Sequence, residues 1–153
     1  MTSKFSITQQ NPHSIPAQTM IAALWKEIQQ RYGFTGECDI NPSDFTVVKA
    51  LFLVAFVGDL PVGSIGLKPL SEEIAELDTL YVSPEFRKQG VARALLQKLE
   101  AHARLHRFRA IRLRAGGEQP EALRFYKKMG FVSIPCFGNY ASSEANLCFE
   151  KRL

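Results

Sequence analysis

The chain has 153 residues, of which 46% are hydrophobic and 22% charged, which suits one domain with a buried core and excludes a disordered or fibrous protein. A net charge of +4 and an isoelectric point near 9.1 are compatible with an anionic ligand. They fall short of the concentrated basic face of a nucleic-acid-binding protein.

Neither a targeting segment nor a disulfide framework is indicated by the sequence. The N-terminus, MTSKFSITQQ, lacks the apolar core of a signal peptide, and the longest apolar run, residues 50–57, is too short to span a bilayer. Three widely spaced cysteines, Cys38, Cys136 and Cys148, form no closed disulfide set and no CxxC pair for zinc. We therefore expect a soluble cytoplasmic protein with reduced thiols, no bound metal and no membrane partner.

The first third of the chain predicts a short strand and then a helix. Residues 4–8 have the pattern of a strand, and residues 15–31 have helical spacing. Ser14 precedes this helix as a candidate N-cap, and Gly33 follows it, where glycine suits a left-handed C-terminal position. The stretch from there to Ser43 predicts a loop.

Three strands are predicted next. Residues 51–57 and 62–67 are apolar runs joined by the turn at residues 58–61, which predicts a hairpin. Residues 74–82 predict a third, long strand. It ends at Pro84, because proline cannot extend a strand ladder.

The second half of the chain predicts two helices among further strands. Residues 89–106 form the clearest helix, and residues 120–129 a shorter one. Strands are predicted at residues 110–115, 131–134 and 147–151. The order β-α-β-β-β-α-β-α-β-β indicates an α/β (α+β) domain in which helices cover a mixed sheet.

The most informative segment is a strand followed by a basic, glycine-containing loop and a strong helix. A helix N-terminus has unpaired backbone N–H groups and a partial positive charge, which favour a bound phosphate. Arg87 and Lys88 add charge, while Gly90 and Ala92 keep the loop small. The segment matches neither the P-loop nor GxGxxG, and by itself it is equally compatible with a solvated turn.

Two linked blocks of sequence resemble the motifs of the GNAT acetyltransferase superfamily. Residues 77–92, LDTLYVSPEFRKQGVA, resemble its strand–loop–helix motif, and residues 119–131, QPEALRFYKKMGF, resemble its second motif. The resemblance implies a single N-acetyltransferase domain over residues 1–153. It implies a mixed, mostly antiparallel central sheet of about six to seven strands flanked by about four helices.

The resemblance also implies a site for acetyl-CoA as co-substrate, without a metal. The backbone of Leu80, Tyr81 and Val82 would bind the pantetheine arm, and Gln119 would contact this arm in place of the usual asparagine. The pyrophosphate would be bound by the backbone N–H groups of the loop and helix start: Arg87, Lys88, Gln89, Gly90, Val91 and Ala92.

Two residues are candidates for the catalytic proton transfers. Tyr126 matches the family tyrosine that lies near the coenzyme sulfur and can act as a general acid, although a tyrosine in this pattern can also be part of the core. Glu76 matches a glutamate base in some members, with Asp78 or a water relay as alternatives. Strand alternation places Glu76, Asp78, Leu80 and Val82 on one side of their strand.

The sequence does not define the acceptor. The resemblance implies a direct transfer of acetyl to the primary amine of a small molecule or peptide, and it allows a homodimer. A non-catalytic acyl-CoA-binding module is the alternative function. The pair His102 and His106 lacks a third metal ligand, and the arginine run at residues 104–114 is better explained by a half-exposed strand than by nucleic-acid binding.

Overall fold

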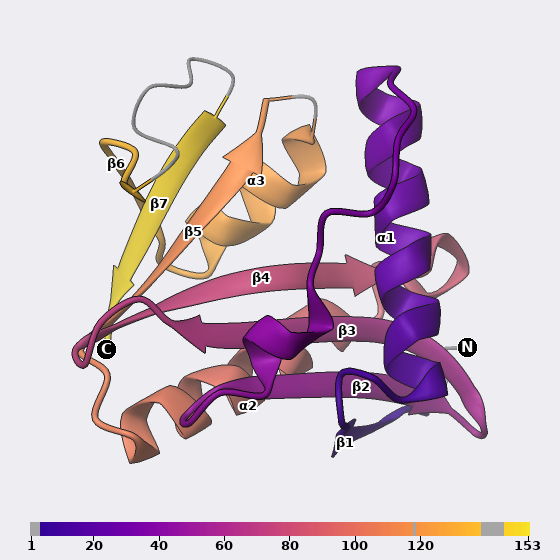
Figure 1. Cartoon of the computed structure of the whole chain (residues 1–153), viewed down its shortest axis with the longest axis horizontal. Coiled ribbons are helices and arrows are strands. Elements are labelled where there is room, and N and C mark those ends of the chain that lie inside the picture. The colour runs from indigo at the N-terminus through magenta and orange to yellow at the C-terminus, as the bar shows by residue number, and fades with distance from the viewer. Residues whose placement is uncertain (1–3, 118, 139–145) are drawn as a thin grey trace.

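The protein, described by a computed structural model over residues 4–117, 119–138 and 146–153, has the predicted order of helices and strands (Figure 1). Its elements are β1 (Ser6–Gln9), α1 (Ile15–Tyr32), the 3₁₀ turn η1 (Pro42–Phe45), β2 (Leu51–Val57), β3 (Leu60–Pro69), β4 (Ile74–Val82), the 3₁₀ turn η2 (Pro84–Phe86), α2 (Val91–Leu105), β5 (Ala110–Gly116), α3 (Pro120–Lys128), β6 (Val132–Ile134) and β7 (Asn146–Arg152). The described residues contain three α-helices, where about four were expected.

The strands form one seven-stranded sheet in the order β1-β2-β3-β4-β5-β7-β6. Every neighbouring pair is antiparallel except β4 and β5, which are parallel. The predicted fold class, a mixed and mostly antiparallel sheet covered by helices, is confirmed.

Local capping explains why α1 begins and ends as predicted. The Ser14 side chain accepts a hydrogen bond from the Ala17 N–H at 3.4 Å, as an N-cap does. Gly33 has a φ of 68°, and its N–H donates to the Gln29 carbonyl at 2.8 Å. The left-handed backbone at this position costs glycine nothing, so the helix stops there.

The helices cover opposite faces of the sheet (Figure 1). On one face, α1 packs Met20 and Ile21 against Phe52 of β2. On the other face, α2 packs Leu95 and Leu99, both fully buried, into the larger of two apolar clusters, and α3 joins the same cluster. Because each face of the sheet has its own core, a side chain on β4 belongs to the α1 side or to the α2 side.

The sheet opens between its two parallel strands. β4 and β5 pair at only three positions, Ile74 with Ala110, Ala75 with Ile111 and Glu76 with Arg112. Beyond these pairs β4 continues beside β3 while β5 continues beside β7. The two strands therefore separate and leave a wedge (Figure 1).

A β-bulge interrupts β4 next to this wedge. Ser64 of β3 pairs with Tyr81, and Gly66 pairs with Asp78, so two residues of β4 lie opposite one residue of β3. Thr79, one of the two, has a φ of 56°, and its carbonyl accepts a hydrogen bond from the buried Ser64 hydroxyl at 2.8 Å. A bulge of this kind bends a strand and shifts the phase of its side chains.

The prediction that Glu76, Asp78, Leu80 and Val82 share one side of β4 is therefore wrong. The carboxylates of Glu76 and Asp78 lie 3.6 and 3.5 Å from Nζ of Lys68, which lies over an aromatic ring of the α1-side cluster. Leu80 and Val82 pack into the α2-side cluster instead. The side chains of β4 do not alternate regularly between the two faces of the sheet, because the bulge adds one residue to this strand.

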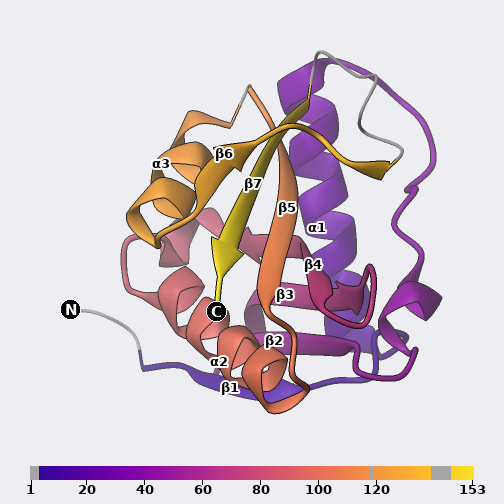
Figure 2. The ribbon, with the colours of Figure 1, turned by 90° about the vertical axis from the view of Figure 1, so that its left-hand side faces the viewer.

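The prediction of three reduced thiols is also wrong. Cys136 and Cys148 form a disulfide across a sequence separation of 12, with their Cα atoms 5.1 Å apart, while Cys38 is free and exposed. β6 pairs with β7, and Ile134 lies opposite Cys148 (Figure 2). This pairing brings Cys136, two residues further on, to the other cysteine, a contact that cysteine spacing alone does not reveal.

Thiol counting tests this disulfide. Protein purified without reductant and then denatured is expected to show one reactive thiol, and three after reduction, because only Cys38 is free. Reduction is expected to lower the free energy of unfolding by about 3 kcal/mol, the loop-entropy value for a loop of this size. Cys38→Ser is the matched control, with no thiol before reduction. Three reactive thiols before reduction would contradict the structure.

Candidate active site

A cleft of about 410 Å³ occupies the wedge between β4 and β5. α1 and the segment after it contribute four lining residues, β4 four, β5 three, and α3 with the residue before it two. Of the predicted site residues, Leu80, Gln119 and Tyr126 line the cleft, and so does the alternative base Asp78. Tyr32 and Gln119, which are 87 residues apart in sequence, thus line the same cleft.

Tyr126 of α3 lines this cleft. The residue is 7% exposed, and its ring packs against Phe131 and Phe149 with centroids 5.6 and 6.5 Å apart. Burial raises the pKa of the Tyr126 hydroxyl well above its usual value, and the negative charge of Asp78 raises it further. The phenol therefore remains protonated at neutral pH, as a proton donor must.

The start of α2, which follows β4 through η2, has the geometry of an anion site. Gly90 is the N-cap with a φ of 87°, and no side chain in the described residues caps it by a hydrogen bond. Ala94 N–H makes the first helical bond, to the Gly90 carbonyl at 3.0 Å, so the N–H groups before it have no helical acceptor. The Arg87 N–H, in contrast, donates to the Pro84 carbonyl at 3.3 Å, which places it in the preceding turn.

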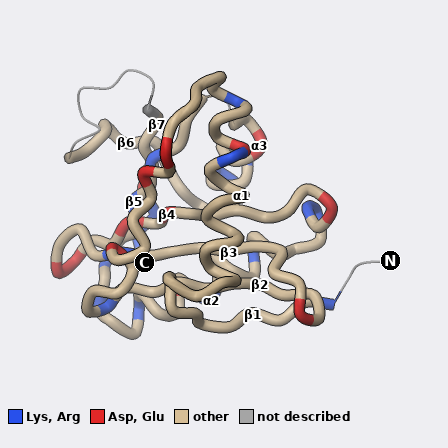
Figure 3. Tube along the Cα trace, turned by 45° about the vertical axis from the view of Figure 1, so that its right-hand side comes forward, with Lys and Arg blue, Asp and Glu red and all other residues tan. Residues whose placement is uncertain are grey.

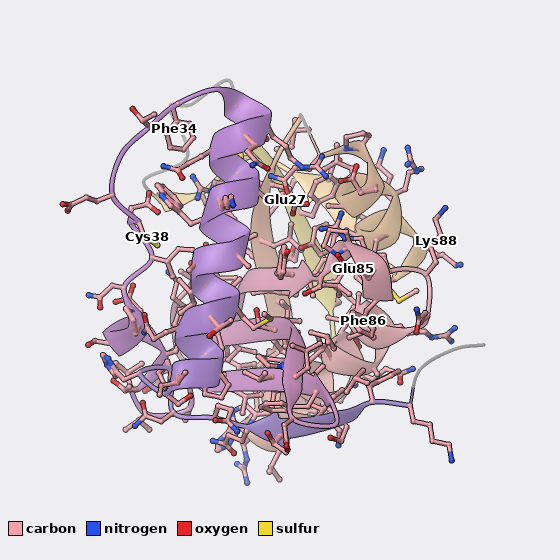
Figure 4. All side chains as sticks on the ribbon, turned by 90° about the vertical axis from the view of Figure 1, so that its right-hand side faces the viewer. Glu27, Phe34, Cys38, Glu85, Phe86 and Lys88 are labelled. Atoms are coloured by element: carbon pink, nitrogen blue, oxygen red, sulfur yellow. A yellow bond between two sulfur atoms is a disulfide. The ribbon has the colours of Figure 1, made fainter. Side chains whose placement is uncertain are left out.

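The Arg87 side chain faces α1, and Glu27 is the partner that sequence reasoning missed. Nη2 of Arg87 donates to Oε1 of Glu27 at 2.6 Å, and Nε donates to the Val82 carbonyl at 2.8 Å. The guanidinium also lies 5.8 Å from the Tyr81 ring centroid. Figure 4 shows Glu27 on α1 and exposed Lys88 on the loop. The ion pair joins two segments 60 residues apart, a separation at which no local pattern exists.

The two candidate bases differ in their exposure to the cleft. Glu76 is 4% exposed, is not among the cleft-lining residues, and lies beside Lys68. Asp78 lines the cleft, and its Oδ1 accepts a hydrogen bond from the Thr79 N–H at 2.7 Å. With Asp44 also 3.9 Å from Lys68, three carboxylates lie within 4 Å of one ammonium.

The C-terminal end of α1 lines the cleft and contacts α3 and the residue before it. Arg31 forms an ion pair with Glu121 of α3, and Nε2 of Gln119 donates to the Tyr32 hydroxyl at 3.4 Å. The Tyr32 hydroxyl also lies against the backbone of Gly116, where an added Cβ would be 1.5 Å from it. Glycine at this position therefore allows α1 to approach β5.

Other candidate features lie away from the cleft. The rings of His102 and His106 lie against each other with their centroids 4.3 Å apart. Nε2 of His102 lies 3.0 Å from the Lys49 carbonyl oxygen. Within the described ranges, no three His, Cys, Asp or Glu side chains are grouped as metal ligands. Three arginines of the basic run each lie within 4 Å of a glutamate: Arg104, Arg109 and Arg112. Acidic and basic positions are interspersed along the trace (Figure 3).

The chain belongs to the Acetyltransferase (GNAT) family, whose sequence profile matches residues 18–131. A probable N-acetyltransferase named camello, from Xenopus laevis, is 31% identical over 131 residues. The alignment covers 77% of this chain and 60% of that relative. This chain thus spans about three fifths of the length of that relative.

Solved structures share the fold over nearly the whole chain. A GNAT-family acetyltransferase from Staphylococcus aureus Mu50 superposes with a TM-score of 0.83 at 19% identity and covers 98% of this chain and 99% of its own. The PaiA N-acetyltransferase from Thermoplasma acidophilum, solved in complex with coenzyme A, superposes with a TM-score of 0.76 at 22% identity and covers 98% and 99%. These likenesses confirm the fold.

Two glycines with the same backbone conformation provide a test of the anion site. Gly90 and Gly58 have φ values of 87° and 59°, and an added Cβ would meet no atom within 4 Å at either position. Gly90→Ala and Gly58→Ala should each lower the free energy of unfolding by about 1–2 kcal/mol, the cost of the left-handed region. Only Gly90→Ala should weaken coenzyme A binding, by about tenfold, since a shift of one or two N–H groups there costs roughly 1.4 kcal/mol.

Isothermal titration calorimetry with coenzyme A measures this difference, and denaturant unfolding checks the stability of both variants. Equal affinities for Gly90→Ala, Gly58→Ala and the wild type would rule out the start of α2 as the phosphate site.

Proposed function

We propose that this protein is an acetyl-CoA-dependent N-acetyltransferase that transfers acetyl directly to a primary amine. The observation that carries the proposal is the wedge between β4 and β5, which has Tyr126 and Asp78 in its lining. Membership of the GNAT family and the coenzyme A complex of the PaiA N-acetyltransferase support it.

The residues present fit the coenzyme. The open N-terminus of α2, from Lys88 to Ala92, would bind the pyrophosphate through backbone N–H groups. The strand segment Leu80–Val82 would hydrogen-bond the pantetheine arm beside the bulge, and Gln119 would contact the arm from the other wall. When bound, acetyl-CoA supplies the acetyl group as a thioester.

Asp78 is the carboxylate to which we assign the role of general base for the incoming amine. An incoming amine is an ammonium at neutral pH and must lose a proton before it can attack a carbonyl carbon. Asp78 lines the cleft, with the Thr79 N–H on its Oδ1 and Nζ of Lys68 3.5 Å from its Oδ2, and we assign this carboxylate as the acceptor of that proton. Glu76, the residue predicted from the family motif, is buried beside Lys68 and contributes negative charge behind Asp78.

Tyr126 is the residue to which we assign the role of general acid, which donates a proton to the departing thiolate. Its raised pKa keeps the proton on the hydroxyl until negative charge develops on sulfur. A backbone N–H at the bulged part of β4 would stabilise the carbonyl oxygen as negative charge develops on it.

The Tyr126→Phe variant separates an enzyme from an acyl-CoA-binding module. An enzyme is expected to lose about 10²-fold in kcat, the lower range for a general acid, while coenzyme affinity stays at the wild-type value. Thiol release from acetyl-CoA over a panel of amines gives the rate, and calorimetry gives the affinity. Tight coenzyme binding without turnover of any amine by the wild type would favour the binding module.

Two isosteric variants identify the base. Asp78→Asn is expected to lower kcat/KM by about 10²- to 10⁴-fold, since it removes the proton acceptor from the cleft. Glu76→Gln should keep most of the activity and instead lower the free energy of unfolding by about 1–3 kcal/mol, because it removes the buried carboxylate from its ion pair with Lys68. A large loss of kcat/KM in Glu76→Gln together with a small loss in Asp78→Asn would instead identify Glu76 as the base.

A further inference from the structure

The charges in the cleft lining point to the chemical class of the acceptor. Of the cleft-lining residues, two carry a full charge, Asp78 of β4 and Arg114 of β5. The others are apolar, aromatic or neutral polar side chains, or glycine. A ligand that fits this lining carries one positive and one negative group.

The strand register places the two charged side chains opposite each other. Asp78 and Arg114 each lie two residues beyond the last pair between the parallel strands, Glu76 with Arg112. Side chains two residues apart point to the same face of a strand, so both follow Glu76 and Arg112 to the α1 side. The strands are about 4.8 Å apart where they pair and further apart beyond, so the two groups lie on facing walls of the wedge.

The charge around Asp78 favours a single ammonium. Three carboxylates lie within 4 Å of Lys68, which leaves this wall with a surplus of negative charge. The facing guanidinium of Arg114 repels a second cation and offers paired N–H donors to a carboxylate. A polyamine or an aminoglycoside, with several ammonium groups and no carboxylate, therefore does not match the lining.

The third wall is apolar and is fixed in place. Leu24, Ile28, Tyr32 and Phe34 line the cleft from α1 and the segment after it. Phe34 packs edge-to-face on Trp25 with ring centroids 5.5 Å apart. Figure 4 shows Phe34 beside the C-terminal end of α1.

Hydrogen bonds hold the segment after α1 in this position. Nε2 of Gln29 and Nε1 of Trp25 both donate to the Gly36 carbonyl, at 2.9 and 3.3 Å. The apolar wall is therefore preformed, and its aromatic members suit a bulky apolar group.

We propose that the acceptor is an α-amino acid with a bulky apolar or aromatic side chain. Asp78 binds its ammonium, Arg114 binds its carboxylate, and its side chain packs against the α1 wall. This assignment rests on the proposed N-acetyltransferase activity. In the reaction a C–N bond forms as the thioester C–S bond breaks. Of the two protons that nitrogen loses, one ends on sulfur through Tyr126 and one leaves to solvent through Asp78.

A pair of ligands that differ only in the carboxylate, L-phenylalanine and L-phenylalaninamide, tests the proposal. L-alanine tests the role of the apolar wall, and spermidine tests the preference for a single ammonium. All four are compared by thiol release from acetyl-CoA and by calorimetry on the complex with coenzyme A. The wild type should prefer L-phenylalanine over its amide by roughly 10- to 100-fold in kcat/KM and in Kd, the range for a hydrogen bond to a charged partner. L-alanine should bind more weakly than L-phenylalanine, since it cannot reach the apolar wall.

Arg114→Gln should abolish the preference for acid over amide, through a loss of roughly 10- to 100-fold in kcat/KM for L-phenylalanine. Arg114→Lys keeps the charge and should retain part of the preference. Arg109→Gln is the matched control, because Arg109 lies just before β5, is not among the cleft-lining residues and is mostly exposed. A preference for spermidine, or an acid preference that survives Arg114→Gln, would overturn the assignment and leave the N-acetyltransferase activity standing. Binding of L-phenylalanine that depends on Arg114, without acetylation of any amine, would support the ligand class and refute the proposed function.

Discussion

The site depends on the point at which β4 and β5 stop pairing. A parallel pair normally continues along its length, but here it ends at Glu76 and Arg112, after three pairs. β5 instead follows β7 for seven pairs, and β4 follows β3 through a bulge at Thr79 that increases its twist. Each strand keeps one partner and turns its other edge to the wedge, where backbone N–H and C=O groups need a ligand or water.

The two halves of the site are connected through α1. Glu27 holds Arg87 of the loop before α2, and Arg31 holds Glu121 of α3. The helix that supplies the apolar wall is therefore joined by ion pairs both to the loop before α2 and to the helix that carries Tyr126. Partly exposed pairs of this kind each contribute about 1 kcal/mol or less to stability, so their main effect is to fix the position of α1.

Local chemistry made much of this predictable. Capping residues such as Ser14 and Gly33 define helix ends within a few residues of sequence, and the two motif blocks located Tyr126 beside the strand that carries Leu80. The rest depends on long-range contacts. The bulge breaks the period of two that alternation assumes, so the sheet face predicted for Leu80 was wrong. The disulfide at Cys136 depends on strand pairing, which cysteine spacing does not encode. The homodimer and the cytoplasmic location stay predictions. Among the described residues, none of the helices combines the length and the hydrophobicity of a membrane span.

A crystal structure of the protein with coenzyme A tests the central claim most directly. The account predicts the sulfur in the wedge, within about 3.5 Å of the Tyr126 hydroxyl, and the pyrophosphate on the backbone N–H groups that follow Arg87, at hydrogen-bond distances of about 2.7–3.2 Å. Coenzyme bound on another face of the sheet, or bound with its sulfur outside the space between β4 and β5, would contradict it.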